Sequence, residues 1–246
     1  MAKKILITGA SSGIGRALVY ELAGRGYALA LTARSIETLE VIRDDIQTKH
    51  PSTRVVVHAL DVTAYDTVPG TLAACAEGLG GLDIVLANAG IGLGDKVGRG
   101  RFDDARRTIE TNLLGAMATV DAAVAYFLEQ GHGHVVGTSS VVAYRGMPRS
   151  GSYCASKAGL AIYLESLRAE VYRKNIHVSV LYPGYIDTPL NEMLKSRPFL
   201  ISAEKGAAII ADMIARRVKS STVPVWPWRI LAPMLRLLPA SVMAKF

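Results

Sequence analysis

Tyr153 and Lys157, in the stretch SGSYCASKAGLAIYLESL (residues 150–167), are the first candidates for a chemical role. They are four residues apart, so on a helix they share one face, one turn from each other. A phenol has a reference pKa of about 10, and a neighbouring ammonium stabilises the phenolate and lowers that pKa. The pair could therefore act as an acid/base. The alternative is a core tyrosine beside a lysine whose stem is buried and whose amine reaches water; the spacing alone does not decide.

A glycine-rich stretch, TGASSGIG (residues 8–15), follows an apolar run near the amino terminus. Glycines permit a tight turn and a close backbone approach to a ligand, and the free N–H groups of a following helix can hold a pyrophosphate. The spacing is GxxxGxG rather than the commonest dinucleotide fingerprint. Its position after a first strand nevertheless predicts nucleotide binding. The candidate cofactor-binding residues of this turn are Gly9, Ser11, Ser12, Gly13, Ile14 and Gly15.

The end of the second predicted strand bears on the choice of nucleotide. A carboxylate there would accept from a free ribose 2′-OH, but the sequence has Ala33 followed by Arg34. A guanidinium can bind a 2′-phosphate, with Ser35 as a further hydroxyl donor. We therefore expect NADP (NADPH) as cofactor, with NAD the less favoured alternative. The competing interpretation of Arg34 is an ordinary surface arginine.

Polar or small residues also follow the later predicted strands. Asp61, next to Val62, could accept from an adenine amino group, or could cap a helix. Asn88, Ala89 and Gly90 suit a backbone beside a cofactor, and a strand-terminating turn explains them nearly as well. Ser140 ends the fifth predicted strand, where it could meet Tyr153 over a bound ligand.

The elements that must position these residues alternate along the chain. The predicted strands are 3–8, 27–33, 54–60, 82–87, 133–139 and 176–182, and the predicted helices are 13–25, 36–49, 64–79, 103–129, 151–174 and 203–217. Near-continuous apolar strands separated by helices indicate a parallel sheet covered on both faces. The fold class is therefore α/β, a doubly wound parallel sheet, whose ligands bind beyond the carboxyl ends of the strands.

Composition narrows the classes of protein further. The chain has 246 residues, 50% hydrophobic and 20% charged, which excludes disorder and suits a single domain over residues 1–246. The net charge of +7 is spread out rather than gathered on one element, so we expect no nucleic-acid partner. Cys75 and Cys154 lack metal-ligand spacing; we expect two reduced core thiols and no metal site. We expect no signal peptide and no membrane span, and hence a cytoplasmic protein.

Taken together, the motifs resemble those of the short-chain dehydrogenases/reductases. TGASSGIG, NAG, Asn112 in IETNLLG, Ser140, YCASK and YPGYIDT occur in the order and spacing of that family, over residues 3 to about 217. The resemblance implies a Rossmann fold and an NAD(P)-dependent interconversion of a carbonyl compound and an alcohol.

The resemblance also implies roles for individual residues. Tyr153 would be the general acid/base, Ser140 would hold the substrate oxygen, and Lys157 would lower the pKa of Tyr153 and bind the nicotinamide ribose. Asn112 would position a water in a proton relay to Lys157. In PGYIDT, Pro183 and Gly184 would flank the nicotinamide, and Ile186 and Thr188 would contact its carboxamide. Arg34 matches the NADP-preferring members, although Ser12 stands where some of them carry a basic residue.

The substrate and assembly are less defined by these patterns. The family's pocket positions here hold Val142, Tyr144, Met147, Tyr185, Met193, Leu194 and Phe199, which favours a lipophilic carbonyl compound. The family commonly pairs subunits through the two long helices, so we expect a homodimer or homotetramer. A non-catalytic NADPH-binding regulator on the same fold is an alternative. An epimerase is disfavoured, because such relatives need a larger substrate domain.

The apolar tail, residues 223–246, departs from an ordinary member of the family. It holds four prolines, two tryptophans and two arginines within apolar sequence, which argues against a membrane span. Three interpretations remain: packing over the substrate site or a subunit partner, lying at a membrane interface as a peripheral membrane protein, or a frayed end.

Overall fold

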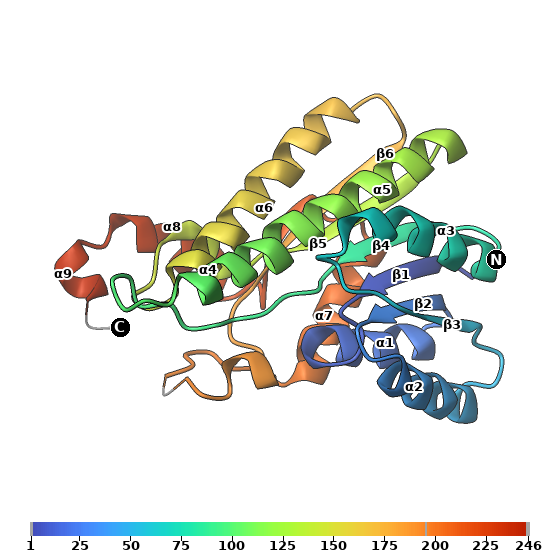
Figure 1. Ribbon diagram of the computed structural model, residues 1–246, viewed down its shortest axis with the longest axis horizontal. Coiled ribbons are helices and arrows are strands. Elements are labelled where there is room, and N and C mark those ends of the chain that lie inside the picture. Colours follow the sequence, from blue (N-terminus) through green and yellow to red (C-terminus); the bar gives the residue numbers. More distant parts are fainter. Residues whose placement is uncertain (1, 195, 245–246) are drawn as a thin grey trace.

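A single parallel sheet forms the centre of the computed structural model, which describes residues 2–194 and 196–244 (Figure 1). Its strand order is β3-β2-β1-β4-β5-β6-β7, so the direction of winding reverses between β1 and β4. The predicted doubly wound sheet and its six predicted strands are confirmed. The strands are β1 (Lys4–Thr8), β2 (Ala28–Ala33), β3 (Val55–Ala59), β4 (Ile84–Ala87), β5 (Gly133–Thr138), β6 (Ile176–Pro183) and β7 (Ser220–Val223).

Strand β7 was not predicted from the sequence. Its four residues, SSTV, lack an apolar run, and the strand pairs with β6 along one side only. A short edge strand of this kind carries little sequence signal, because only half of it is buried. The pairing with β6 forms it.

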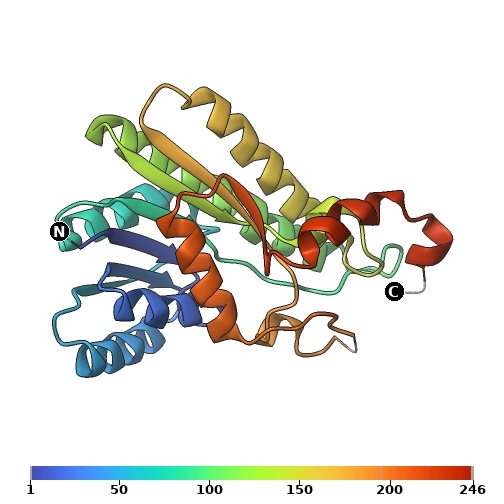
Figure 2. The same ribbon diagram turned by 180° about the vertical axis from the view of Figure 1, so that it is seen from behind.

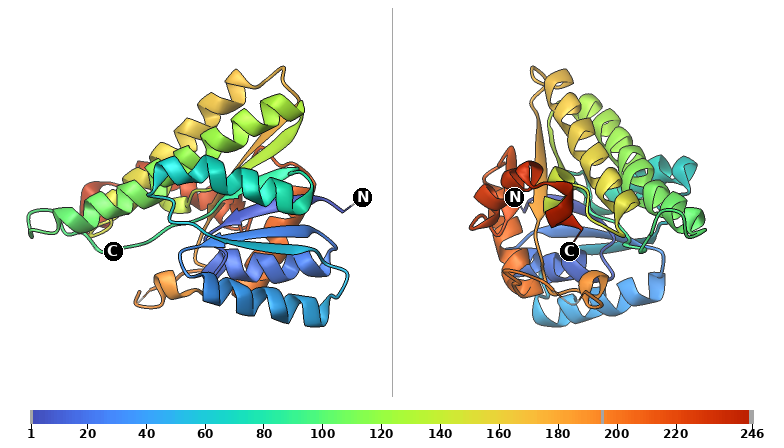
Figure 3. Two further views of the ribbon diagram at one scale, coloured as in Figure 1. Left: turned by 45° about the vertical axis from the view of Figure 1, so that its right-hand side comes forward. Right: turned by 90° about the vertical axis from the view of Figure 1, so that its left-hand side faces the viewer.

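Helices cover both faces of the sheet, as Figure 3 shows. Helices α1, α2 and α7 lie on one face, and α3, α5 and α6 lie on the other. The helices are α1 (Gly13–Gly24), α2 (Ile36–Lys49), α3 (Val68–Leu79), α4 (Phe102–Ile109), α5 (Gly115–Gln130), α6 (Gly151–Glu170), α7 (Ala203–Ala215), α8 (Trp228–Met234) and α9 (Ala240–Met243). Short turns of 3₁₀-helix are η1 (Tyr65–Thr67), η3 (Val141–Tyr144), η4 (Pro189–Asn191) and η5 (Leu235–Leu237), and a π-helical segment, Glu110–Leu114, joins α4 to α5.

The core consists of two apolar clusters, one on each side of the sheet. Leu18 and Ile42 belong to the cluster under α1, α2 and α7, and Phe127 and Leu164 to the other. All four side chains are 0–1% exposed. Cys75 is also buried, and it and the second cysteine are free thiols, as the sequence predicted. The strands are thus held from both faces, which fixes where their carboxyl ends lie.

The continuous helical stretch Phe102–Gln130 is, within the described residues, the one helix long and apolar enough by composition to cross a membrane. The sequence analysis predicted no stretch that could span a membrane, and this helix meets the criterion of length and composition. Part of its apolar surface is explained by packing, because Val120, Ala123 and Phe127 lie in the core. A core helix satisfies the same criterion of length and composition.

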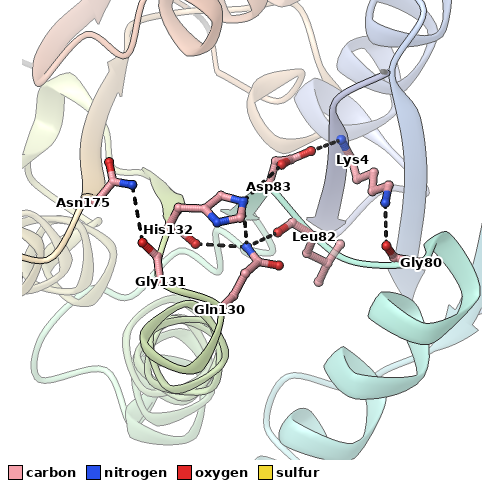
Figure 4. A network of polar contacts seen from close by, with 8 residues as sticks. All are labelled: Lys4, Gly80, Leu82, Asp83, Gln130, Gly131, His132 and Asn175. Carbon is pink, nitrogen blue, oxygen red and sulfur yellow. Dashed lines mark hydrogen bonds and ion pairs between the residues drawn. The ribbon is translucent and has the colours of Figure 1, made fainter.

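A polar network closes the amino-terminal edge of the sheet, away from the predicted site (Figure 4). The Asp83 carboxylate accepts from the backbone N–H of Lys4 at 2.8 Å, and the Gln130 amide donates to the carbonyl of Leu82 at 2.8 Å. These bonds tie β1 and the end of α5 to the turn before β4. Polar groups at this edge of the sheet are thereby hydrogen-bonded within the chain.

The tail returns over the carboxyl-terminal edge of the sheet, as seen at the red end of Figure 2. Trp228 is 5% exposed and Ala232 is 0% exposed, so the inner face of α8 is part of the core. The Arg145 guanidinium donates to the carbonyl of Leu238 at 3.0 Å, and Arg236 donates to the carbonyl of Tyr144 at 3.2 Å. The tail thus packs against the chain segment that follows β5.

Candidate active site

The glycine turn after β1 has the geometry of a cradle. Gly9 and Gly13 adopt φ of +69° and +53°, a region that L-residues with a side chain rarely occupy. Gly15 is packed so tightly that a Cβ there would overlap the carbonyl oxygen of Gly9. Ser12 precedes α1 without a side-chain capping bond, which leaves the first N–H groups of the helix for a ligand. The turn therefore fits a phosphate group, as the sequence predicted for this motif.

Asn88 holds this turn against the neighbouring strands. Its backbone N–H donates to Thr8 Oγ1 at 3.0 Å, its Nδ2 donates to Thr8 O at 3.1 Å, and its Oδ1 accepts from Thr138 Oγ1 at 3.3 Å. The N–H of Ala89 also donates to Thr8 Oγ1, at 3.1 Å. Asn88 and Ala89, which follow β4, thus connect the carboxyl end of β4 to the ends of β1 and β5 by hydrogen bonds. These contacts show the role in the turn, and the predicted place of the two residues beside a cofactor stays a prediction.

Ser140, Tyr153 and Lys157 lie at the carboxyl end of β5 and the start of α6. The Lys157 side chain is 4% exposed, and its Nζ donates to the carbonyl of Thr138 at 2.8 Å. The same Nζ lies 5.8 Å from the centre of the Tyr153 ring. Ser140 is 8% exposed, and its hydroxyl donates to the carbonyl of Pro183 at 3.2 Å. The three predicted side chains are thus in one place.

The structure gives the direction of the pKa shifts of Tyr153 and Lys157. Burial raises the pKa of Tyr153 to about 12, although hydrogen bonding with Ser140 acts in the opposite direction. Burial lowers the pKa of Lys157 to about 8. Desolvation is the largest influence on the Tyr153 pKa in the chain alone, and the lowering expected from Lys157 stays a prediction for the protein with its cofactor bound. A protonated phenol at neutral pH is the form that can donate a proton.

Asn112 lies in the π-helical segment between α4 and α5 and is 0% exposed. Its Oδ1 accepts from the N–H of Ile91 at 2.7 Å, and its Nδ2 donates to the carbonyl of Ile91 at 2.8 Å and to Ser156 Oγ at 3.3 Å. A Cβ on Gly90 would lie 3.2 Å from Asn112 Oδ1 and 3.4 Å from Lys157 Nζ. Asn112 thus joins the loop after β4 to α6. A π-segment at such a point is a common feature of functional sites.

The polar side chains predicted to bind the adenosine end of the cofactor are more exposed to solvent than Ser140 and Lys157. Arg34 is exposed at the end of β2, and it helps to hold the pKa of Asp61 below its usual value, after the hydrogen bond from the N–H of Thr63. Asp61 Oδ1 accepts that bond at 2.9 Å, which closes a local turn. The helix cap that the sequence left open for Asp61 is not formed, because Ala64 and Thr67 stand at the N-cap positions of η1 and α3. Ser35 donates to Glu37 at 2.9 Å, so a carboxylate that the sequence reasoning missed lies beside it. Val62 is 7% exposed and packs against α5.

The chain segment that follows β6 lies next to the glycine turn. Thr188 Cβ would be 3.6 Å from a Cβ placed on Gly13, although the two residues are far apart in sequence. Thr188 can therefore contact a ligand held by the turn. Ile186 cannot do so through its side chain, which is 1% exposed and packed in the core. Only the backbone of Ile186 is placed to make the predicted contact with a carboxamide.

The substrate side contains a residue that the sequence reasoning did not single out. The Trp228 ring lies 6.0 Å from Tyr185 and 5.7 Å from Phe199, and it packs so closely on Gly184 that a Cβ there would overlap its Nε1. Among the described residues, the buried Nε1–H has no hydrogen-bond partner. The unusual WPW sequence in the tail was the available signal. Met193 is 92% exposed, so its predicted place in the pocket is not formed here.

Within the described ranges, no group of three His, Cys, Asp or Glu side chains could hold a metal ion. The site instead consists of a glycine cradle, a buried lysine, a tyrosine and a serine at the carboxyl edge of a doubly wound sheet. This combination defines the Rossmann-fold oxidoreductases, whose fold binds nicotinamide cofactors.

The chain belongs to the short-chain dehydrogenase family, whose model matches residues 3–198. It is 37% identical to an uncharacterized oxidoreductase of Mycobacterium tuberculosis (strain ATCC 25618 / H37Rv), over 99% of this chain and 97% of that protein. It is 33% identical to 11-beta-hydroxysteroid dehydrogenase 1A of Arabidopsis thaliana, over 95% of this chain and 73% of that one. An alcohol dehydrogenase from the archaeon Thermococcus sibiricus, solved with 5-hydroxy-NADP, has a similar fold, with a TM-score of 0.81, 29% identity, and coverage of 90% of this chain and 96% of that one.

Proposed function

We propose that this oxidoreductase uses NADP(H) to interconvert a lipophilic ketone or aldehyde and the corresponding alcohol, with Tyr153 as general acid/base. The observation that carries the proposal is the meeting of Ser140, Tyr153 and the buried Lys157 at the edge of the sheet that also bears the glycine turn. Each of the three groups has a distinct task in moving a proton to or from one oxygen.

Several residues fit a nicotinamide cofactor. Gly9, Gly13 and Gly15 leave room for a pyrophosphate at the start of α1, and Thr188 lies above that turn. Lys157 can bind the nicotinamide ribose, and the Pro183–Gly184 backbone can flank the ring. The cofactor, when bound, supplies or accepts the hydride.

Proton transfer is the task of the chain's own side chains. In the reducing direction the Tyr153 hydroxyl gives its proton to the substrate oxygen as the carbonyl carbon gains a hydride, so a ketone plus hydride and proton becomes an alcohol. Ser140 donates a hydrogen bond to the same oxygen and holds it. The raised pKa of Tyr153 keeps the phenol protonated before the reaction. Lys157, close to the resulting phenolate, stabilises its negative charge, with Asn112 at the entrance of a water relay.

Preference for NADP rests on Arg34. This guanidinium is exposed at the end of β2, where a 2′-phosphate would lie. Glu37 close by, bonded to Ser35, weakens the site for a phosphate. The two side chains have opposite effects, so the preference should be moderate rather than absolute.

An apolar substrate fits the aromatic side chains around Gly184. The Trp228 ring packs there against both Tyr185 and Phe199. A hollow of about 530 Å³ between α9 and the loop after η3 is lined by Met147 and Met243 among others. These surfaces suit a hydrocarbon body rather than a charged sugar or acid.

The assembly that we propose is a homodimer or homotetramer built on α5 and α6. These helices lie side by side on one face of the molecule, as Figure 1 shows. Leu128 on α5 is 49% exposed and Ile162 on α6 is 64% exposed. Burial of these side chains against a second copy would remove apolar surface from water.

The test of the proposal is a panel of ketones, aldehydes and alcohols, read as NADPH or NADH absorbance, with wild type and Tyr153→Phe. We expect the variant to keep its cofactor affinity and lose turnover by roughly 10²–10⁴-fold, as for loss of a general acid/base. Tyr172→Phe is the matched control, since Tyr172 is 82% exposed. Near-normal turnover of Tyr153→Phe would refute the role of Tyr153. Cofactor binding by wild type without turnover on any panel member would favour the regulator.

Cofactor choice is tested separately. Arg34→Asp should move the ratio of the kcat/KM values for NADPH and NADH toward NADH, because a carboxylate repels the 2′-phosphate and accepts from a 2′-OH. Arg173→Asp, another exposed arginine, controls for the change in net charge. An unchanged ratio would remove Arg34 from the account.

A further inference from the structure

Large apolar side chains are exposed in two stretches of the chain, residues 190–200 and the tail. Trp226, Ile230, Met234 and Leu237 are 72%, 52%, 50% and 81% exposed, and we call these four residues the tail face. They fall within twelve consecutive positions, although exposed apolar residues are normally scattered singly over a surface. A cluster of exposed apolar residues of this kind is a candidate interaction surface.

The tail face is the outer side of an amphipathic element. Ile230 and Met234 are four residues apart in α8, which places them on one side of that helix, with Trp226 in the turn before α8 and Leu237 in η5 after it. The opposite side is buried, since Trp228 and Ala232 are 5% and 0% exposed. The inner side thus accounts for the stability of the element, and the outer side has no partner within the described residues.

Charge distinguishes between possible partners. No Asp or Glu follows Asp212 in the sequence, whereas Arg or Lys stands at 216, 217, 219, 229, 236 and 245. Arg229 is exposed and follows Trp226 by three positions in the chain. Tryptophan is a residue type that is enriched at membrane–water interfaces. An apolar stripe flanked by cations, with an exposed tryptophan at one end, matches the boundary between acyl chains and anionic headgroups.

A second copy of the chain fits this surface less well. In a twofold pairing of the tail face, residues 213–246 of the other copy would offer Arg229 no side-chain carboxylate. The apolar side chains exposed on α5 and α6 provide a separate face for assembly.

Residues at the substrate side extend the apolar surface. Phe199 is 51% exposed and meets Trp228 edge to face at 5.7 Å, and Leu194 is 49% exposed. Figure 2 shows the segment around η4, in orange, at the same end of the molecule as α8 and α9, in red. A surface bound through the tail face would therefore lie close to the side of the molecule that carries the candidate substrate contacts.

We infer that the tail face docks the protein peripherally on an anionic lipid surface, with the apolar side chains in the interface and Arg229 against the headgroups. This inference does not depend on the proposed oxidoreductase reaction. Binding to a membrane can be measured without turnover.

The test is co-sedimentation of the full-length protein with vesicles of phosphatidylcholine, alone or in an equimolar mixture with phosphatidylglycerol. We expect binding to the anionic vesicles, weaker binding to phosphatidylcholine alone, and a decrease with added salt. The double variant Trp226→Ser/Leu237→Ser should bind at least about tenfold more weakly, from the apolar area it removes. Arg229→Gln should bind anionic vesicles several-fold more weakly, in accordance with about 1 kcal/mol for one cation near an anionic surface.

The matched control is Val41→Ser/Tyr172→Ser, which also removes one aliphatic and one aromatic side chain, 67% and 82% exposed, from other elements. It should bind like wild type, and all variants should show the wild-type circular dichroism and unfolding midpoint. Equal loss in the control and the tail variant would overturn the inference. So would absence of vesicle binding by wild type, or a concentration-dependent dimer, seen by sedimentation velocity, that only the tail-face variant abolishes.

Discussion

Replacement of Lys157 by methionine should stabilise the protein while it abolishes turnover. The Lys157 pKa lies at about 8, below its ordinary value of 10.5, because burial disfavours the ammonium. Each pKa unit corresponds to about 1.4 kcal/mol, so the charged side chain costs the folded state about 3 kcal/mol near neutral pH. Methionine fills the place of the stem but loses the bond from Nζ to Thr138 O, worth about 1–2 kcal/mol. The net expectation at about pH 7 is a gain of about 1–2 kcal/mol in the free energy of unfolding.

The pH dependence of this gain distinguishes it from a packing effect. Between about pH 8 and pH 10.5 the unfolded chain binds more protons at Lys157 than the folded chain, so the wild type gains stability as the pH rises. Methionine does not titrate. The difference in unfolding free energy between the two proteins should therefore shrink by about 2 kcal/mol between about pH 7 and pH 9.5.

Urea unfolding of the two proteins at one fixed protein concentration, over this range of pH, measures the difference. Lys174→Met is the control, since Lys174 is exposed and in no ion pair among the described residues. Its difference from wild type should be small and independent of pH. If the Lys157→Met difference is flat with pH, or if the variant is less stable than wild type at neutral pH, burial of the ammonium is not what sets the Lys157 pKa.

Two further predictions concern backbone and capping. Gly15→Ala should destabilise the fold and abolish cofactor binding, because the added Cβ would overlap Gly9 O. Thermal unfolding and NADPH fluorescence titration measure the two effects. The control Gly70→Ala, at a helical glycine with nothing within 4 Å of an added Cβ, should be neutral or stabilising by up to about 1 kcal/mol, and equal losses in both variants would contradict this account. Asp95→Ala should lower the free energy of unfolding by about 1–2 kcal/mol, because the Asp95 carboxylate accepts from the Ser152 N–H at 2.8 Å. Amide hydrogen exchange at the start of α6 should become faster. Unchanged exchange there would show that the contact does not hold the helix.

The fold and the location of the site could be predicted from short-range patterns. Apolar runs with the period of buried strands, separated by helical segments, specified six of the seven strands and the face of the sheet at which ligands bind. The spacing of Tyr153 and Lys157 predicted one face of one helix, and the glycine motif predicted the turn after β1. Each of these signals is local, because it depends on residues within a few positions of one another.

The protonation states could not be predicted in the same way. The sequence places an ammonium one turn from a phenol, and from this pairing alone a lowered Tyr153 pKa follows. The folded chain buries Lys157 and partly buries Tyr153, and loss of hydration moves the two pKa values in the directions opposite to those of a simple ion pair. Burial is the sum of many distant contacts, which no local pattern contains.

The sequence by itself determined the parallel sheet, the glycine turn, and the identity and order of the reactive side chains. Only the tertiary structure decided that Thr188 covers Gly13, that Trp228 packs on Gly184, and that Asn88 ties three strands together. It also divided the tail into a buried side and an exposed side, a distinction that its uniformly apolar composition hides. The physical reason is the same in each case: periodicity sets which way a side chain points along its own element, whereas its neighbours come from elements far away in the chain.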